Sequence, residues 1–128
     1  MVEDFGAQEP ACGVTRPGMF AAVRAGFRYN RIQEIADTDS NVETPILYVS
    51  GDVHQLASGW CAGTFRLAIH TIQGYYAPWD AKNHIVSVEY CHMGQTLVFQ
   101  PVDYATELHE GLRTGLDQCL SEIADRTL

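Results

Sequence analysis

The chain has 128 residues, 46% of them hydrophobic, and a formal net charge of −8 at pH 7. This length predicts one domain that buries a sizeable core, and the lack of a long apolar run excludes a membrane-spanning helix. The excess of acidic residues argues against general nucleic-acid binding, because such binding neutralises phosphates with a surplus of lysine and arginine.

Residues 1–16 predict an extended or mobile N-terminal arm in front of a single domain over residues 17–128. This segment contains Gly6, Pro10 and Gly13 but only scattered apolar side chains. No apolar run follows its acidic start, so it does not resemble a secretory signal, and we expect a chain that is not exported.

A helix is predicted to begin near Arg16, because Thr15 is a suitable N-cap and a proline follows in the first turn. Apolar residues then recur at helical spacing at Phe20, Val23 and Phe27. The polar residues after this segment, 37–41, are turn formers and predict a loop.

Basic and acidic residues are separated along the chain. Residues 16–31 contain no acid and carry Arg16, Arg24, Arg28 and Arg31. Residues 103–125 carry six acidic residues and only one basic residue, Arg113. Two interpretations are open: solvated helices with a local charge bias, or a head-to-tail contact in which unlike faces of two copies meet and close into a ring.

Two strands are predicted in the middle of the chain. The apolar run PILYVS, residues 45–50, predicts a buried strand, and residues 59–72 predict a long central strand in which side chains alternate. The side chains expected to face the core are Phe65, Leu67, Ile69 and Thr71. Those expected to face solvent or a neighbouring subunit are Arg66, Ala68, His70 and Ile72. Gly59 and Gly63 predict a bulge or a close backbone contact.

Residues 74–80, GYYAPWD, are predicted to form a loop that is unusually rich in aromatic side chains. Tyr75, Tyr76 and Trp79 are therefore candidate anchors of a contact surface. The alternative is a loop that folds back over the edge of the core.

Residues 83–92 fit either a helix or a strand. Their β-branched content favours a strand, and the turn-like residues His92–Gln95 predict that it turns there and returns over residues 96–99. We therefore expect a hairpin in this part of the chain.

The C-terminal segment predicts an amphipathic helix more clearly than any other. Its apolar stripe consists of Tyr104, Leu108, Leu112, Leu116, Cys119, Leu120 and Ile123. Gly111 and Gly115 lie beside the stripe and would permit close packing. Together the elements predict an α+β domain with a mainly antiparallel sheet of about four strands and both helices packed on one face.

Patterns typical of catalysis or cofactor binding are not evident, since the sequence has no phosphate-binding loop, nucleophile elbow or zinc-protease motif. Cys61, His70, Cys91 and His92 would form a metal site only if their strands were neighbours, and adjacent strand residues face opposite sides. A thiol–histidine pair, Cys61 with His70 or Cys91 with His109, has no support beyond composition. We predict no catalytic, cofactor-binding or metal-binding residues.

The cysteines are scattered and form no paired motif. They are Cys12, Cys61, Cys91 and Cys119. Four cysteines allow three pairings, among which the sequence does not choose, and we expect free buried thiols in a chain without an export signal.

Residues 44–73, TPILYVSGDVHQLASGWCAGTFRLAIHTIQ, resemble the central part of tail terminator and related neck proteins of long-tailed bacteriophages. In those families a proline-led apolar strand precedes a glycine turn and a long alternating strand. A late helix then carries a segment similar to LHEGL, residues 108–112 here. The resemblance covers about half of the chain, and residues 83–102 depart from it because the family pattern would have more helix there.

The resemblance implies a non-enzymatic virion protein that is assembled in the host cytoplasm and forms a homo-oligomeric, hexameric ring. The ring would cap the tail tube and join it to the head connector. The implied partners are other copies of the chain, the tail tube protein and the head-side connector protein, with no membrane and no sequence-specific nucleic acid.

The candidate subunit contacts are Arg24, Arg28, Arg31, Arg66, His70, Tyr75, Tyr76 and Trp79. The alternative function is a small α+β enzyme or ligand-binding domain. Its apolar cavity would lie under the aromatic loop 74–80 and would be lined by the three aromatic side chains there and by Phe99.

Overall fold

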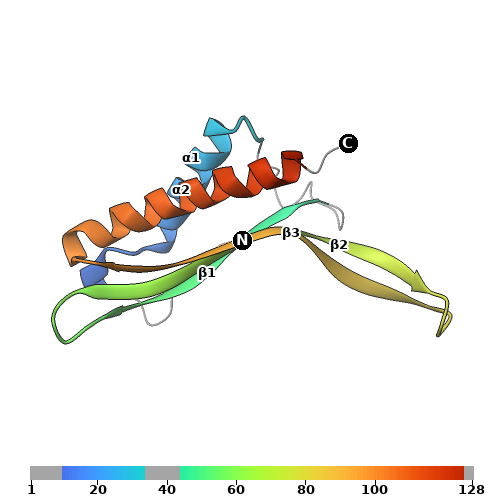
Figure 1. Ribbon diagram of the computed structural model, residues 1–128, viewed down its shortest axis with the longest axis horizontal. Coiled ribbons are helices and arrows are strands. Elements are labelled where there is room, and N and C mark those ends of the chain that lie inside the picture. Colours follow the sequence, from blue (N-terminus) through green and yellow to red (C-terminus); the bar gives the residue numbers. More distant parts are fainter. Residues whose placement is uncertain (1–9, 34–43, 126–128) are drawn as a thin grey trace.

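The computed structural model describes residues 10–33 and 44–125, which form two layers, a sheet and a pair of helices on one of its faces (Figure 1). The elements in chain order are the 3-10 helix η1 (Pro10–Cys12), α1 (Arg16–Tyr29), β1 (Ile46–Gln55), β2 (Cys61–Ala77), β3 (Lys82–Phe99) and α2 (Pro101–Asp125). The sheet is antiparallel in the order β1-β2-β3. Neither helix of the described residues is long and apolar enough to cross a membrane.

The predicted class is confirmed, but the expected four strands are wrong, because the described residues form three. Residues 83–92 are strand, as favoured, yet the turn predicted at His92–Gln95 does not exist. β3 runs through that segment, where Gly94 pairs with Arg66 and His92 with Ala68 of β2. Pairing with β2 gives the backbone amide and carbonyl groups of residues 92–95 hydrogen-bond partners. These hydrogen bonds outweigh the local preference of the four residues for a turn.

The turn that joins β2 to β3 is formed by residues 78–81 instead. Ala81 has a positive φ of 55°, and the amide of Lys82 donates a hydrogen bond to Oδ1 of Asp80 at 3.0 Å. An aspartate that bonds the backbone two residues later is typical of tight turns. Trp79, which is strongly exposed, therefore lies at the tip of a long hairpin.

The start of α1 confirms the prediction. The hydroxyl of Thr15 accepts a hydrogen bond from the amide of Gly18 at 3.1 Å, and Pro17 lies in the first turn. Residues 1–9 of the expected N-terminal arm lie outside the described residues. The rest of that segment packs on the body of the protein, since Cys12 and Val14 are buried.

The core lies between the sheet and the two helices. Phe65, Leu67 and Ile69 of β2 are buried, as the alternation predicted, together with Leu108, Leu112 and Leu116 from the stripe of α2. The two glycines of α2 contact the same strand: a Cβ at Gly111 would lie 3.0 Å from the Phe65 ring, and one at Gly115 would lie 3.0 Å from Leu67. The absence of side chains at these positions lets the helix approach the sheet closely.

All four cysteines form disulfides, so the expectation of free thiols is wrong. Cys12 bonds to Cys61 and Cys91 bonds to Cys119, with Cα–Cα distances of 6.0 and 5.6 Å. The first bond ties η1 to the start of β2, and the second ties α2 to β3. The partners are 49 and 28 residues apart in sequence, and only the fold brings them together.

Candidate functional site: a hairpin arm and two surfaces of the body

β2 and β3 extend far beyond the helices and project from the body as a two-stranded ribbon (Figure 1). We call residues 71–88 the hairpin arm, which pairs from Thr71 opposite Val88 to Ala77 opposite Lys82. The buried core cluster of the described residues takes no member from this segment. The hairpin arm is therefore held by its own ladder of hydrogen bonds and by its base.

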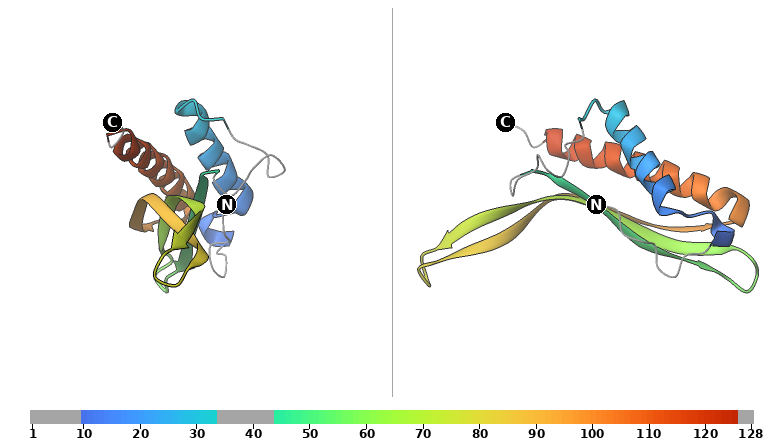
Figure 2. Two further views of the ribbon diagram at one scale, coloured as in Figure 1. Left: turned by 90° about the vertical axis from the view of Figure 1, so that its right-hand side faces the viewer. Right: turned by 180° about the vertical axis from the view of Figure 1, so that it is seen from behind.

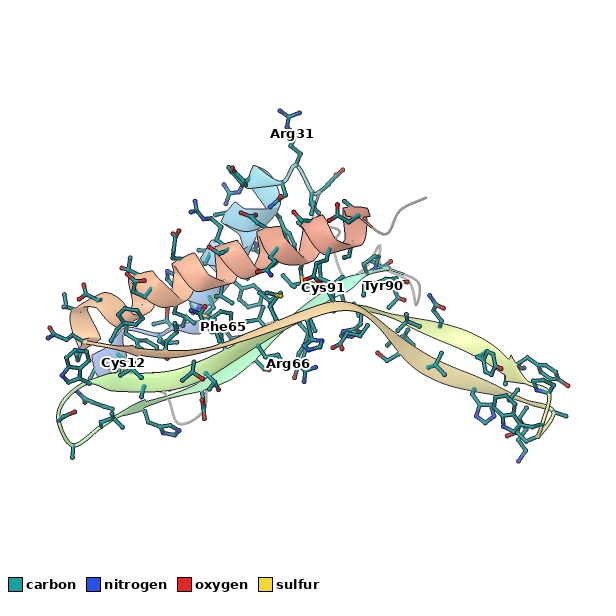
Figure 3. All side chains as sticks on the ribbon, in the orientation of Figure 1. Cys12, Arg31, Phe65, Arg66, Tyr90 and Cys91 are labelled. Atoms are coloured by element: carbon teal, nitrogen blue, oxygen red, sulfur yellow. A yellow bond between two sulfur atoms is a disulfide. The ribbon has the colours of Figure 1, made fainter. Side chains whose placement is uncertain are left out.

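A β-bulge marks that base. Ile69 pairs with Cys91 and His70 with Glu89, so Tyr90 is an extra residue on β3. Figure 3 shows Tyr90 beside Cys91 at the bend where the ribbon leaves the helices. The Tyr90 hydroxyl lies 3.1 Å from Oγ1 of Thr71, and the side-chain amide of Gln73 donates to both oxygens at 3.3 and 3.1 Å. These bonds brace the base of the hairpin arm.

The hairpin arm exposes large apolar side chains on both of its faces. Their exposed fractions are 44% for Tyr75, 57% for Tyr76, 75% for Trp79, 82% for Ile85 and 36% for Val86. The register places Tyr76 and Ile85 on one face and Tyr75 and Val86 on the other, and the rings of Trp79 and Tyr75 pack with centroids 5.7 Å apart. A two-stranded hairpin is marginally stable in water. Such a surface is typical of a segment that another molecule covers.

The prediction for residues 74–80 was therefore wrong in its structure. Residues 74–77 belong to β2, and only the remaining residues lie in the turn. The alternative of a loop folded over the core edge does not match a ribbon that points away from the core (Figure 2). Phe99, which the cavity hypothesis placed beside the aromatic residues, pairs with Cys61 at the other end of β2. The two clearest depressions on the described surface are open, and neither is lined by Tyr75, Tyr76 or Trp79.

The sheet face away from the helices, which we call the open face, carries polar side chains. Arg66 points to this side (Figure 3), and its Nη2 lies 3.1 Å from Oε1 of Glu89, while Nδ1 of His92 lies 3.3 Å from Oε2. His70 packs against the ring of Tyr48 at a centroid distance of 6.4 Å. An exposed ion pair such as that of Arg66 and Glu89 contributes about 0–1 kcal/mol, so this contact is typical of a solvated surface.

The open face does not gather the residues that the metal and hydrolase hypotheses required. Cys61 and Cys91 are buried in disulfides, whereas His92 lies on the open face and His109 lies on α2. In the described part of the chain, no three metal-ligating side chains form a group. Arg66 does meet an acid, but in an open depression that has no thiol.

The second depression lies on α1 and is lined by Arg16, Pro17, Phe20 and Arg24. We call it the Phe20 groove. The guanidinium carbons of Arg16 and Arg24 lie 5.7 and 5.6 Å from the centroid of the Phe20 ring, within the range of cation–π contacts.

Of the arginines predicted as contacts, Arg24 thus lies in the Phe20 groove. Arg28 and Arg31 lie further along, where Nε of Arg28 donates to the carbonyl of Arg24 at 3.4 Å and Arg31 follows the helix end in an exposed position. Near that end, the side chain of Asn30 donates to Oδ1 of Asp117 at 2.7 Å and links the two helices.

Sequence reasoning missed Ile85 and Val86 in the hairpin arm, and Arg16 and Phe20 in the Phe20 groove. The signal for the groove was available, because residues 16, 20 and 24 follow the spacing of one helix face. The exposure of Ile85 and Val86 could be predicted only by recognising that residues 82–88 form a strand that pairs with β2.

Three described groups have a shifted pKa, and none belongs to the hairpin arm. Burial lowers the pKa of His109, whose Nε2 is buried without a hydrogen-bond partner. Hydrogen bonds from the amide and hydroxyl of Thr64 lower the pKa of Asp52, and burial, followed by the charge of Asp52, raises the pKa of Tyr104.

No model of a known protein family matches the chain, and no curated protein sequence matches it either.

Proposed function

We propose that the chain is a non-enzymatic structural subunit of a bacteriophage tail or neck. It forms a homo-oligomeric ring, a hexamer by resemblance, that caps the tail tube and joins it to the head connector. The observation that carries the proposal is the hairpin arm, an apolar ribbon that extends from a body whose core is complete without it.

The hairpin arm supports an assembly role on energetic grounds. Trp79 and Ile85 are 75% and 82% exposed. Covering a large apolar side chain contributes about 1.5–3 kcal/mol, and this gain is realised only when a partner contacts the ribbon. One projecting element per subunit, received by a different surface of the next subunit, produces a head-to-tail contact, and such contacts form a ring when the rotation between neighbours closes.

The assignment to a phage tail or neck rests on the resemblance of residues 44–73 and 108–112. The partners it names are other copies of the chain, the tail tube protein and the head-side connector protein, and the location is the virion. The alternative of an enzyme or ligand-binding domain required a cavity under the aromatic residues. The projecting ribbon does not favour it.

Removing the hairpin arm tests the proposal. Residues 72–87 are replaced by an Asn-Gly turn between Thr71 and Val88, which face each other in the sheet. Native mass spectrometry of the full chain is expected to show a mass near six times 14.2 kDa, alone or with added tail tube protein. The shortened chain is expected to remain a folded monomer, because the core lies outside the deletion.

A matched control keeps the apolar ribbon and changes two of its polar residues, Asn83→Ala with Ser87→Ala, and it is expected to assemble as the full chain does. Electron microscopy of the assembled sample should show rings. A full chain that stays monomeric at high concentration, with and without tube protein, would refute the proposal. A shortened chain that still forms rings would show that the hairpin arm does not hold them.

A further inference from the structure

We propose that the tip of the hairpin arm of one copy docks in the Phe20 groove of the next copy, with Trp79 as its anchor. This inference rests on the proposed ring and identifies the contact that builds it. It joins two exposed features of the described residues: an aromatic tip and a mainly apolar groove with an arginine on each side.

The Phe20 groove has the chemistry of an aromatic receptor. Arg16 and Arg24 are exposed and flank the Phe20 ring, and Pro17 completes the apolar floor. A guanidinium stacks on aromatic faces and has five N–H donors, so it can contact a ring and a carboxylate at once. The groove therefore favours a ligand that combines an aromatic ring with a negative charge.

The tip of the hairpin arm carries aromatic rings and one carboxylate, with Lys82 two residues beyond that carboxylate. Trp79 is 75% exposed and packs on Tyr75, so the pair presents an extended aromatic surface. Asp80 is the acid of the turn, and its Oδ2 lies 2.8 Å from Nε2 of His84. A carboxylate accepts several hydrogen bonds, so Asp80 can bind Arg16 of a neighbouring copy while it keeps His84.

Charge favours this pairing over other contacts between copies. The chain carries a net charge of −8, so two copies repel each other at most orientations. Residues 16–31 are the basic segment of the sequence, and the groove lies within it. Contact between two tips would leave both grooves empty.

The position of the two surfaces makes the contact head to tail. Figure 2 shows the hairpin arm extending from one end of the molecule, while the start of α1 lies toward the other end. A tip therefore cannot occupy the groove of its own chain. A contact between different surfaces of identical subunits repeats from copy to copy. It closes into a ring when the rotation between copies allows closure and otherwise continues as an open filament.

A mixing experiment with two assembly-blocked variants tests the contact. The tip variant is Trp79→Ala. The groove variant combines Arg16→Glu with Arg24→Glu. Its matched control combines Arg28→Glu with Arg31→Glu, which changes the net charge equally in the same segment. Arg28 and Arg31 were predicted as contacts from the sequence, but they do not line the groove, so the proposed contact does not use them. Truncating a central aromatic anchor is expected to weaken association by about 30-fold or more.

Sedimentation velocity is expected to show rings for the wild type and the matched control, and monomers for the tip variant and the groove variant alone. Mixed together, these two variants are expected to form a 1:1 heterodimer of twice 14.2 kDa. The groove variant still has an intact tip and the tip variant an intact groove, so one contact forms and the chain of contacts then stops. This result also shows that both variants are folded.

Four results would overturn the inference. A groove variant that forms dimers alone would indicate contact between tips, and a mixture that stays monomeric would exclude contact between tip and groove. Rings formed by the groove variant would place the contact elsewhere and leave the proposed ring function intact. A wild-type chain that is monomeric with and without tube protein would refute both.

Discussion

Gly63 of β2 is a position where the fold is sensitive to a single added methyl group. It lies in β2 opposite Val53 of β1, and α2 covers it with Tyr104. A Cβ built on Gly63 would lie 2.7 Å from the Tyr104 hydroxyl and 2.9 Å from the Val53 Cα, and it would overlap the carbonyl oxygen of Asp52. Gly63→Ala therefore forces the backbone of β1 or the ring of Tyr104 to move.

The cost is expected at the upper end of the range for overpacking. Overpacked cores lose about 1–3 kcal/mol when flexible side chains can adjust. Here two of the three nearest atoms are backbone, and Tyr104 is 1% exposed, so no flexible chain end can yield. We expect Gly63→Ala to lower the free energy of unfolding by about 3 kcal/mol, which for a chain of this size lowers Tm by about 10 °C.

Gly74→Ala is the matched control, since it makes the same change in the same strand. A Cβ at Gly74 meets no atom within 4 Å, so its free energy of unfolding should stay within about 0.5 kcal/mol of the wild type. Urea unfolding followed by circular dichroism measures both variants. Equal free energies of unfolding for Gly63→Ala and Gly74→Ala would refute the overpacking at Gly63.

Two further predictions concern the Cys12–Cys61 disulfide and the histidine His109, whose Nε2 atom is buried. Cys12→Ser with Cys61→Ser opens a disulfide between residues 49 apart and should lower the free energy of unfolding by about 4 kcal/mol in urea, whereas a loss below about 1 kcal/mol would contradict the entropic argument. The pKa of His109 in the folded chain lies below its ordinary value, so the unfolded chain binds a proton at this histidine more readily than the folded chain. The free energy of unfolding should therefore be independent of His109 above about pH 6.5. Below that pH it should fall by at most about 1.4 kcal/mol per pH unit. His109→Gln should reduce that loss between pH 7 and 5, and an unchanged pH profile would show that His109 is not its source.

Local patterns predicted the parts of the fold that are stabilised locally. Thr15 and the following proline identified the start of α1, and alternating side chains identified β2. The leucine stripe identified α2. Each of these signals lies within a few residues of the element it describes, because capping and amphipathic periodicity are local properties.

The features that were missed depend on pairing across the sheet. The predicted turn at His92 looked favourable alone, but pairing with β2 continues through it. The actual turn has Ala81 at positive φ, where a glycine would be the expected signal. The disulfide partners likewise meet only after the strands and helices are in place. The exposed aromatic residues were predicted as candidate contacts, whereas Ile85 was not, since its exposure depends on the same pairing.

The bulge at Tyr90 explains how one sheet forms both a buried body and an exposed ribbon. In the body, β3 residues 91, 93 and 97 alternate toward the helices, and Cys91 and Leu97 are buried there. The extra residue shifts this alternation, so Glu89 pairs with His70 and lies on the open face beside Arg66. Without the shift, Glu89 would point toward the helices, where burying its charge would cost several kcal/mol. The bulge thus keeps an acid out of the core and, because bulges increase local twist, gives the hairpin arm its direction away from the body.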